Sequence, residues 1–466
     1  MKPSAETPTG GNGRIMVALV IGLFIAGLDM SVVNVMLPTL ADTFGVPVTG
    51  VAIVVTGYVA AMAATLLFFG RWVDLWRAES VFAMGLLVFS LSSFLCAMST
   101  RFEMLLAARV IQGLGGAMSA AASGAVVMRR FPPNRIGSVM GVMMMALGLG
   151  NASGPPIGGW LLQQVAWHWI FLVQVPVGLL GAALMGLGGP PVVAESERHG
   201  ADWRKRLDWQ GALWCMAGFP LLLTGLGRLA AGHWRAPETL LFLAAAIFCV
   251  AGFMRSQRRH SDPLLRFDVF RNPDVTAAVA AKGTLQMTMQ GWVMVFPFFL
   301  ERGVGFSTAR IGSVLMVLSM AMLVTTPSVG RLVDRRSPWK ILGVALIFVA
   351  AAIGGGLVLD PRQPGGLLWV VMVFFGLGQA AFLVTTSVVI VKAAPKGSEG
   401  MYSALNTVIM PVGAALGSTL FSGLYAAGAA DGTPHLGFSA ALWGMLAVVV
   451  VLAGGLACRR SLTGIR

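Results

Sequence analysis

The amino-acid sequence predicts an all-α polytopic membrane protein with both termini in the cytoplasm. Of the 466 residues, 56% are hydrophobic and 11% are charged, a balance that excludes a set of ordinary soluble domains. Fourteen apolar runs approach the length of about 20 residues that an α-helix needs to cross a bilayer. If the loops alternate between the two sides of the membrane, about 25 of the 33 Lys and Arg residues lie on the side of the N-terminus and about six on the other side.

The apolar runs form three groups of six, two and six, separated by polar loops. The first run is long and lacks a small-residue cleavage site, so we expect a retained helix and not a signal peptide. The expected spans are 16–38, 50–70, 80–99, 103–128, 137–163, 169–188, 209–227, 238–254, 275–300, 309–333, 340–359, 366–391, 401–427 and 438–458. The predicted division is a cytoplasmic tail (1–15), a six-helix bundle (16–188), a cytoplasmic loop (189–208), two linker helices (209–254), a second cytoplasmic loop (255–274), a second six-helix bundle (275–458) and a cytoplasmic tail (459–466).

Charge and cysteine usage exclude several other classes of function. The net charge of +14 comes from Arg and Lys spread over many short loops, so it follows the membrane rule and indicates no nucleic-acid partner. The four Cys residues have no C-x-x-C pairing and no His at ligand spacing, so we expect neither a metal site nor a disulfide framework. No Walker-type phosphate loop, H-E-x-x-H or G-x-S-x-G string occurs, and we expect neither an enzyme nor a cofactor.

Two similar strings indicate an internal duplication. Gly70-Arg71-Trp72-Val73-Asp74 ends the second expected span, and Gly330-Arg331-Leu332-Val333-Asp334 ends the tenth. Because the copies lie eight spans apart and not six, two extra helices must separate two six-helix halves. Parallel repeats of this kind build a central cavity in transporters.

Both copies have the pattern G-x-x-x-D at a cytoplasmic helix end. Glycine permits a tight helix exit, and the carboxylate can accept hydrogen bonds from a following helix N-terminus and from loop arginines. We interpret the pattern as a conformational switch at the cytoplasmic side, with loop structure alone as the alternative. The predicted gate residues are Gly70, Asp74, Arg77, Gly330, Asp334 and Arg335.

A third string, G-N-A-S-G-P-P-I-G-G, lies inside the fifth expected span. Its first two glycines are four residues apart and reduce one helix face to backbone, so a neighbouring helix can approach closely. Its two prolines remove backbone hydrogen bonds and bend the helix. An ordinary helix packed through small residues is the alternative. The residues that define the motif are Gly150, Gly154, Pro155, Gly158 and Gly159.

Two opposite charges are expected at the same depth in the membrane. Asp29 lies about 13 residues into a helix that starts at the cytoplasm, or roughly 20 Å deep at about 1.5 Å per residue. Arg109 enters from the other face and reaches roughly 21 Å from the cytoplasm. Such charges can offset each other's burial, and the carboxylate then stays ionised until a proton or a cationic substrate competes. A static ion pair between the first and fourth helices is the alternative.

A polar stripe is expected on the ninth span. Lys282, Gln286 and Gln290 follow one another at four-residue spacing on one helix face. The stripe either lines a substrate cavity, where a cation favours neutral or anionic compounds, or Lys282 extends back to the membrane surface with no role in transport.

Several of these strings resemble one transporter family, the fourteen-helix drug:proton antiporters of the major facilitator superfamily. G-N-A-S-G-P-P-I-G-G is similar to their antiporter motif, L-D-M-S-V-V-N-V-M-L-P (28–38) to their first-helix signature, and L-L-A-A-R-V-I-Q-G-L-G-G (105–116) to their fourth-helix motif. The strings 167–178, 207–211 and 405–417 extend the likeness over nearly the whole chain. Departures include Leu75 and Trp76 in the first G-x-x-x-D copy, and His168 and Gln174 where that family usually has Arg and Asn.

The resemblance implies a major facilitator fold and proton coupling through Asp29 and Arg109. It implies an exporter of amphipathic, drug-like compounds in a bacterial cytoplasmic (inner) membrane, driven by the proton gradient and working as a monomer, with a periplasmic adaptor and outer-membrane channel as possible partners. A dedicated exporter of one metabolite or siderophore is the alternative; a transporter-like receptor or membrane enzyme is less expected. The candidate cavity residues are Met30, Asn34, Gln112, Lys282, Gln286, Gln290, Trp292 and Asn406.

Overall fold

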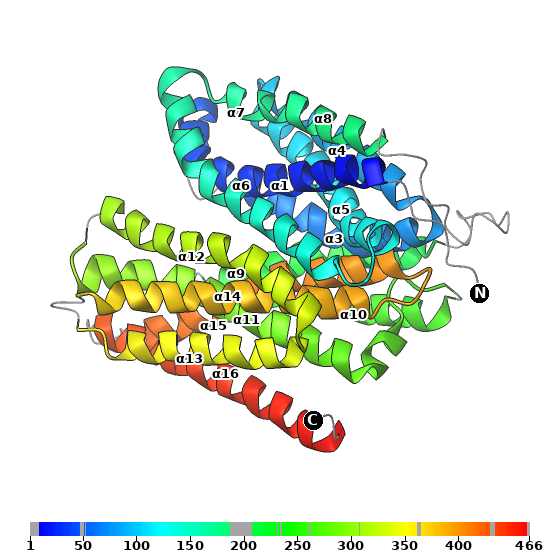
Figure 1. Ribbon diagram of the computed structural model, residues 1–466. Coiled ribbons are helices and arrows are strands. Elements are labelled where there is room, and N and C mark those ends of the chain that lie inside the picture. The colour runs from blue at the N-terminus through cyan, green and yellow to red at the C-terminus, as the bar shows by residue number, and fades with distance from the viewer. Residues whose placement is uncertain are drawn as a thin grey trace. The chain divides into compact units, whose positions relative to one another are not determined.

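The computed structural model describes residues 9–46, 51, 53–186, 207–230, 232–233, 235–260, 262–306, 308–360, 365–428 and 434–463 (Figure 1). Helices and short connections make up this part of the chain, without a strand, which confirms the predicted all-α class. In chain order they are α1 (Thr9–Phe44), α3 (Ile53–Leu75), α4 (Ala78–Ala97), α5 (Phe102–Arg130), α6 (Ile136–Gln164), α7 (His168–Leu172), α8 (Gln174–Gly186), α9 (Trp209–Ala230), α10 (Pro237–Arg259), the 3-10 turn η2 (Phe267–Arg271), α11 (Pro273–Phe298), the π-helical turn η3 (Phe299–Gly303), α12 (Thr308–Arg335), α13 (Pro338–Leu357), α14 (Leu367–Lys392), α15 (Glu399–Gly428) and α16 (Pro434–Thr463).

Thirteen segments among the described residues are long and apolar enough to cross a membrane, with α7 and α8 together forming one of them. Helix α11 has the length but is not among the thirteen, and it is the helix that carries the polar stripe at Lys282, Gln286 and Gln290. The count of fourteen spans and the cytoplasmic position of both termini therefore stay predictions.

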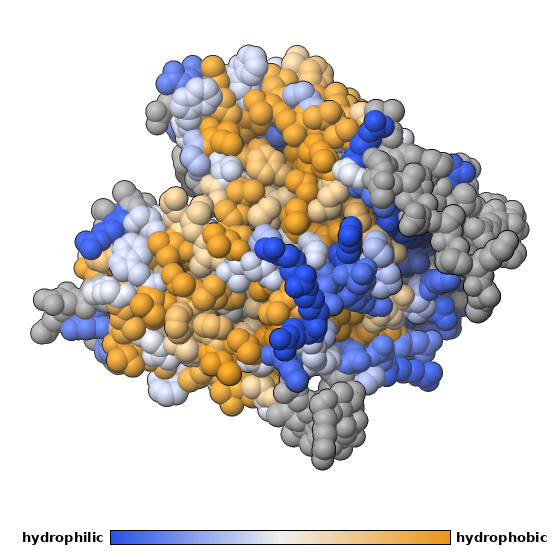
Figure 2. Space-filling view, in the orientation of Figure 1, coloured by the Kyte–Doolittle hydropathy of each residue, from blue (hydrophilic) through white to orange (hydrophobic). Residues whose placement is uncertain are grey.

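Apolar side chains cover much of the visible surface (Figure 2). On α10, Leu241, Ile247 and Phe248 are each about two-thirds exposed, at 68%, 69% and 67%. Large exposed apolar areas mark contact with a membrane or another protein, and on helices of bilayer length they are the surface that lipid covers. A helix also satisfies its backbone hydrogen bonds internally. A membrane span needs this because hydrocarbon offers no hydrogen-bond partners.

The chain divides into two compact units. Unit 1 contains Met1–Pro220, Cys249–Arg266 and Val391–Thr407, and unit 2 contains the remainder. The start of α15 thus belongs to unit 1. The predicted division into bundles of six, two and six helices stays a prediction. Helix α1 extends into the predicted tail 1–15, and the predicted loop 189–208 lies outside the described residues except for its last two.

Glycine allows α1 and α6 of unit 1 to pack backbone against backbone. A Cβ atom at Gly150 would meet the carbonyl oxygen of Phe24 and would lie 2.7 Å from the amide nitrogen of Leu28. A Cβ atom at Gly154 would meet the hydroxyl of Ser31. These approaches are closer than any side chain permits, so the four-residue spacing creates the contact that the sequence predicted for a small-residue helix face.

The other residues at this helix contact differ in how closely they approach α1. Ser31 Oγ donates to the carbonyl of Gly27 at 3.1 Å and reaches the carbonyl of Gly150 at 3.5 Å, which adds a polar link across the two helices. A Cβ atom at Gly158 would lie 2.8 Å from Val32, whereas one at Gly159 would meet nothing within 4 Å. The side chain of Pro155 lies outside what the structure describes.

We predict that Gly150→Ala destabilises the protein and that Gly159→Ala does not. The added methyl group at Gly150 must push α1 away, which typically costs about 1–3 kcal/mol in a packed interior. The same methyl group at Gly159 enters open space and gains helix propensity. Thermal unfolding of the purified variants in detergent measures both effects, and equal melting temperatures would contradict the packing argument.

Candidate functional site

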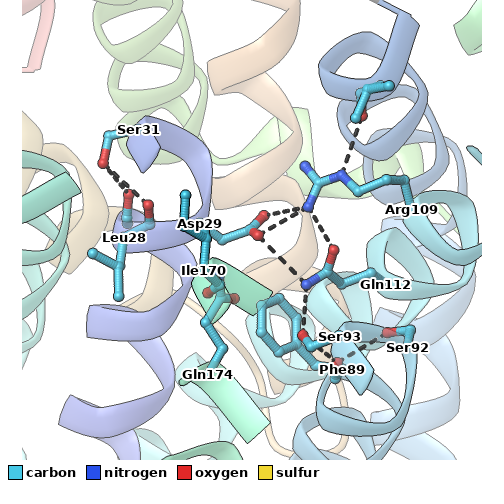
Figure 3. Close-up of polar contacts among 12 residues, drawn as sticks. Leu28, Asp29, Ser31, Phe89, Ser92, Ser93, Arg109, Gln112, Ile170 and Gln174 are labelled. Carbon is cyan, nitrogen blue, oxygen red and sulfur yellow. Dashed lines mark hydrogen bonds and ion pairs between the residues drawn. The ribbon is translucent and has the colours of Figure 1, made fainter. Parts of the chain in front are cut away.

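A fully buried ion pair joins α1 to α5. Arg109 Nη1 donates to the two carboxylate oxygens of Asp29 at 2.9 and 2.8 Å, and both residues are 0% exposed (Figure 3). The sequence placed the two charges at the same depth without deciding whether they touch. The structure shows that they do.

Gln112 holds the pair in place from the next turn of α5. Its side-chain oxygen accepts from Arg109 Nη1 at 2.5 Å, and its Nε2 donates to Ser93 Oγ on α4 at 2.7 Å and to Asp29 at 3.4 Å. Ser93 in turn donates to the carbonyl of Phe89 at 2.8 Å. Gln112, which was expected to face the substrate cavity, is 0% exposed and belongs to the polar network of the ion pair.

Helix α3 supplies the remaining contacts of the guanidinium group. Arg109 Nε donates to the carbonyl of Val54 at 3.2 Å, and its central carbon lies 4.5 Å from the centre of the Tyr58 ring. Removing one partner from a buried ion pair costs about 3–5 kcal/mol, because the other charge is left without compensation. A proton on Asp29 would cancel one of these two charges without removing any atom.

A second polar site lies where α3 ends. Asp74 accepts hydrogen bonds from the backbone amides of Gly400 at 2.6 Å and Met401 at 3.1 Å, in the first turn of α15. Those amides have no partner within their own helix, and a carboxylate there also interacts favourably with the helix dipole. From the sequence, a helix that directly follows in the chain was expected to supply these amides. The helix that Asp74 caps instead begins more than 300 residues later.

Close backbone approach accompanies this cap. A Cβ atom on Gly70 would lie 2.8 Å from the carbonyl oxygen of Gly400, so the glycine of G-x-x-x-D permits the two helices to meet. On α5, the amide of Gly124 donates to Ser403 Oγ at 3.1 Å, and Ser403 donates to the carbonyl of Ala120 at 3.2 Å. The start of α15 is therefore packed into unit 1 through glycine positions on two helices.

Sequence reasoning missed an ion pair at the same place. Arg129 contacts Glu399 at 3.3 Å and donates to the carbonyls of Val73 and Trp76, also at 3.3 Å. Its only sequence signal is the Arg129-Arg130 pair at the end of an apolar run. Such a pair is typical of any cytoplasmic helix end, so it does not indicate this ion pair.

The other predicted gate residues are less informative. Arg77 directly precedes α4. The second copy ends α12, where Gly330 is buried, Asp334 is partly exposed and Arg335 is exposed.

The polar stripe on α11 is largely internal to unit 2. Lys282 is 3% exposed, and its ammonium group donates to Ser387 Oγ on α14 at 2.9 Å. This position favours the interior over an extension to the membrane surface. Gln286 and Gln290 are partly buried on the same helix.

Trp292 does not have the surroundings expected of a cavity-lining residue. It is 0% exposed and stacks between Phe296 and Phe375, with ring centres 4.7 and 4.2 Å away. The aromatic ring fills a hydrophobic core instead. Of the other cavity candidates, Met30 is 41% exposed and Asn406 is 7% exposed, and the side chain of Asn34 lies outside the described part of the chain.

We predict that Asp74→Ala loosens the contact between α3 and α15. Losing a helix cap of this kind costs about 0.5–2 kcal/mol, and each 1.4 kcal/mol is a factor of about ten in an opening equilibrium. In a background without the four native cysteines, Ser403→Cys should then react with a maleimide about ten times faster. Thr386→Cys, equally buried on α14, should react at an unchanged rate. Unchanged labelling at Ser403→Cys would contradict a role of Asp74 in holding this contact.

Comparison with known proteins places this architecture in a family. The family model described as the Major Facilitator Superfamily matches residues 19–418. The chain is 29% identical over 434 residues to the tetracenomycin C resistance and export protein of Streptomyces glaucescens, covering 92% of this chain and 80% of that protein. It is 28% identical over 415 residues to a riboflavin transporter of Clostridioides difficile, covering 88% of each.

Solved structures show the same fold. The human organic anion transporter MFSD10 matches with a TM-score of 0.68 at 16% identity, over 96% of this chain and all of that one. The family match and the all-helical architecture agree with the resemblance found in the sequence. The chain belongs to the major facilitator superfamily, and it is a membrane transporter and not an enzyme.

Proposed function

We propose that this transporter exports amphipathic organic compounds in exchange for protons, across the cytoplasmic membrane of a bacterium. The observation that carries the proposal is the desolvated pair of Asp29 and Arg109, because a buried carboxylate is the group on which a proton can act. Relatives named for multidrug resistance support the substrate class, among them the multidrug resistance protein B homologue of Mycobacterium tuberculosis. We further propose that the chain functions as a monomer, to which a periplasmic adaptor and outer-membrane channel can be joined.

The coupling chemistry follows from the contacts of the pair. While Asp29 is ionised, the adjacent guanidinium stabilises its charge. A proton neutralises the carboxylate and leaves Arg109 with the amide of Gln112, the carbonyl of Val54 and the ring of Tyr58. The protonated and deprotonated states then prefer different arrangements of α1 and α5. A ligand shifts a conformational equilibrium only by its difference in affinity for the two states, and here the proton is such a ligand.

The cap of α15 supplies an element for the conformational cycle. Asp74, Arg129 and Glu399 stabilise an arrangement in which the start of α15 lies against α3 and α5. In the proposed cycle these contacts break when the binding site opens to the cytoplasm and form again when it closes. The bonds are few and polar, so they can exchange for bonds to water at modest cost.

We propose that the buried Lys282 of α11 narrows the substrate class. In unit 2, Lys282 is buried beside a neutral hydroxyl. A protonated Lys282 beside the proposed transport pathway would repel cationic drugs, which favours neutral or anionic substrates. A dedicated exporter of one compound is the second candidate function. Two relatives favour it, since one is named for tetracenomycin C and another for riboflavin.

We predict that Asp29→Asn abolishes proton coupling. In proteoliposomes with an imposed pH gradient, a panel of fluorescent dyes should be moved by the wild type, and each dye should trigger proton release. In Asp29→Asn, release should fall at least about tenfold, because the amide cannot exchange a proton in this pH range. Asp208→Asn provides a matched control, since Asp208 is equally buried but bonds to Ser256 and Gln257.

Folding of the variant is controlled separately. Asp29→Asn leaves Arg109 buried without a counter-charge, which is destabilising. The double variant Asp29→Asn with Arg109→Gln removes both charges, and we expect it to fold and to remain uncoupled. Full coupling in either variant would sink the proposal, as would wild-type dye movement that ignores the gradient.

A further inference from the structure

One buried polar atom of unit 1, at the start of α8, is not explained by the contacts described so far. Gln174 opens α8 and is 1% exposed. Its Nε2 donates to the carbonyl of Ile170 at 3.2 Å, but its side-chain oxygen has no hydrogen-bond partner among the residues that the structure describes. A buried amide oxygen without a donor is costly, and such an atom in a folded protein calls for an explanation.

Helix packing fixes the depth of Gln174 in unit 1. A Cβ atom at Gly181 of α8 would lie 2.9 Å from both Ile21 of α1 and Leu86 of α4, so the three helices meet there. One turn nearer the start of α8, a Cβ atom at Gly178 would meet the hydroxyl of Ser90, one turn further along α4. Helix α8 therefore runs antiparallel to α4.

Two helical turns from that meeting point lie Asp29 on α1, Ser93 on α4 and Gln174 on α8. Each is seven or eight residues away, or about 11–12 Å along its helix. Ser93 and Asp29 already share the amide of Gln112, at 2.7 and 3.4 Å. Figure 3 draws the side chain of Gln174 together with the residues of this network. The oxygen without a donor thus lies in the layer of the proton-accepting carboxylate.

A protonated Asp29 carries a hydrogen that it can donate, so it needs a hydrogen-bond acceptor. An ionised carboxylate only accepts hydrogen bonds, but a protonated one also donates. Arg109 Nη1 and Gln112 Nε2, which contact Asp29, are both donors. Ser93 already accepts from Gln112 and donates to the carbonyl of Phe89.

We propose that the side-chain oxygen of Gln174 accepts the hydrogen bond of protonated Asp29, directly or through one water. Gln174 would then be a positioning residue that stabilises the proton-loaded carrier and sets the pH at which it loads. This inference rests on the proposed proton exchange at Asp29. A bridging water would find a further polar partner in Ser90, whose hydroxyl also has no hydrogen-bond partner among the described residues.

Among the described residues, the other ionisable groups that interact with Asp29 come from three helices. They are Arg109 of α5, Tyr58 of α3 and Cys96 of α4. The sequences of α6 and α8 contain no ionisable side chain. A change at Gln174 therefore alters hydrogen bonding near Asp29 without changing the charges around it.

Infrared spectroscopy of the reconstituted protein tests this without a transported ligand. The carboxylic-acid C=O band that disappears in Asp29→Asn reports protonation of Asp29 as the pH is lowered. Gln174→Met has a similar shape but no strong acceptor. We expect its titration midpoint to fall by about one pH unit, a tenfold weaker proton affinity, because the protonated form loses a hydrogen bond. Its C=O band should also move to higher frequency.

Three further variants complete the test. Gln379→Met removes a comparably buried amide from α14 and should leave the Asp29 band and midpoint unchanged. Gln174→Asn keeps an amide oxygen and should shift the midpoint less than Gln174→Met does. Gln174→Leu replaces the Met variant if that protein does not fold.

The outcomes separate the inference from the proposed function. A wild-type band that titrates, with the same midpoint and frequency when Gln174 is apolar, overturns the inference and leaves proton exchange at Asp29 intact. The absence of any titrating Asp29 band in the wild type overturns both.

Discussion

The arrangement of unit 1 depends on one constraint, which is that Asp29 and Arg109 have been removed from water together. Either charge by itself would carry a desolvation penalty of several kcal/mol, so each must remain within bonding distance of the other. The shell around them uses groups from α1, α3, α4 and α5, including the amide of Gln112 and the carbonyl of Val54. A shift of any of these helices changes the balance of a charge pair that water does not screen.

Close helix packing holds the helices around the buried ion pair in place. The glycines at 150 and 154 let α6 lie backbone to backbone on α1, the helix that carries Asp29. At the other polar site, Gly70 lets α3 approach α15, and Asp74 then caps it. In both places glycine allows two helices to approach closely, and a polar group forms hydrogen bonds that fix how the helices are oriented. Such contacts are well suited to two discrete arrangements, because a close-packed interface resists intermediate positions.

Several parts of the site could be predicted from sequence, and the reason is geometric. Helix rise converts residue number into depth, so Asp29 and Arg109 could be assigned to one layer before any contact was known. No such rule predicts how a helix is rotated about its axis, or which distant helices pack together. Trp292 was therefore expected at a cavity but packs between Phe296 and Phe375. The pairing of Arg129 with Glu399, 270 residues apart, had no specific sequence signal.

The sequence by itself determined the helical class, the approximate positions of the apolar helices, the transporter family and the charged residues within those helices. These follow from hydrophobic length, from the cost of burying charge and from motifs contained within single helices. Only the tertiary structure decided which charges meet, which helix Asp74 caps and that the oxygen of Gln174 is buried without a donor. Those outcomes depend on helix rotation and on contacts between segments distant in the chain, which local periodicity does not specify.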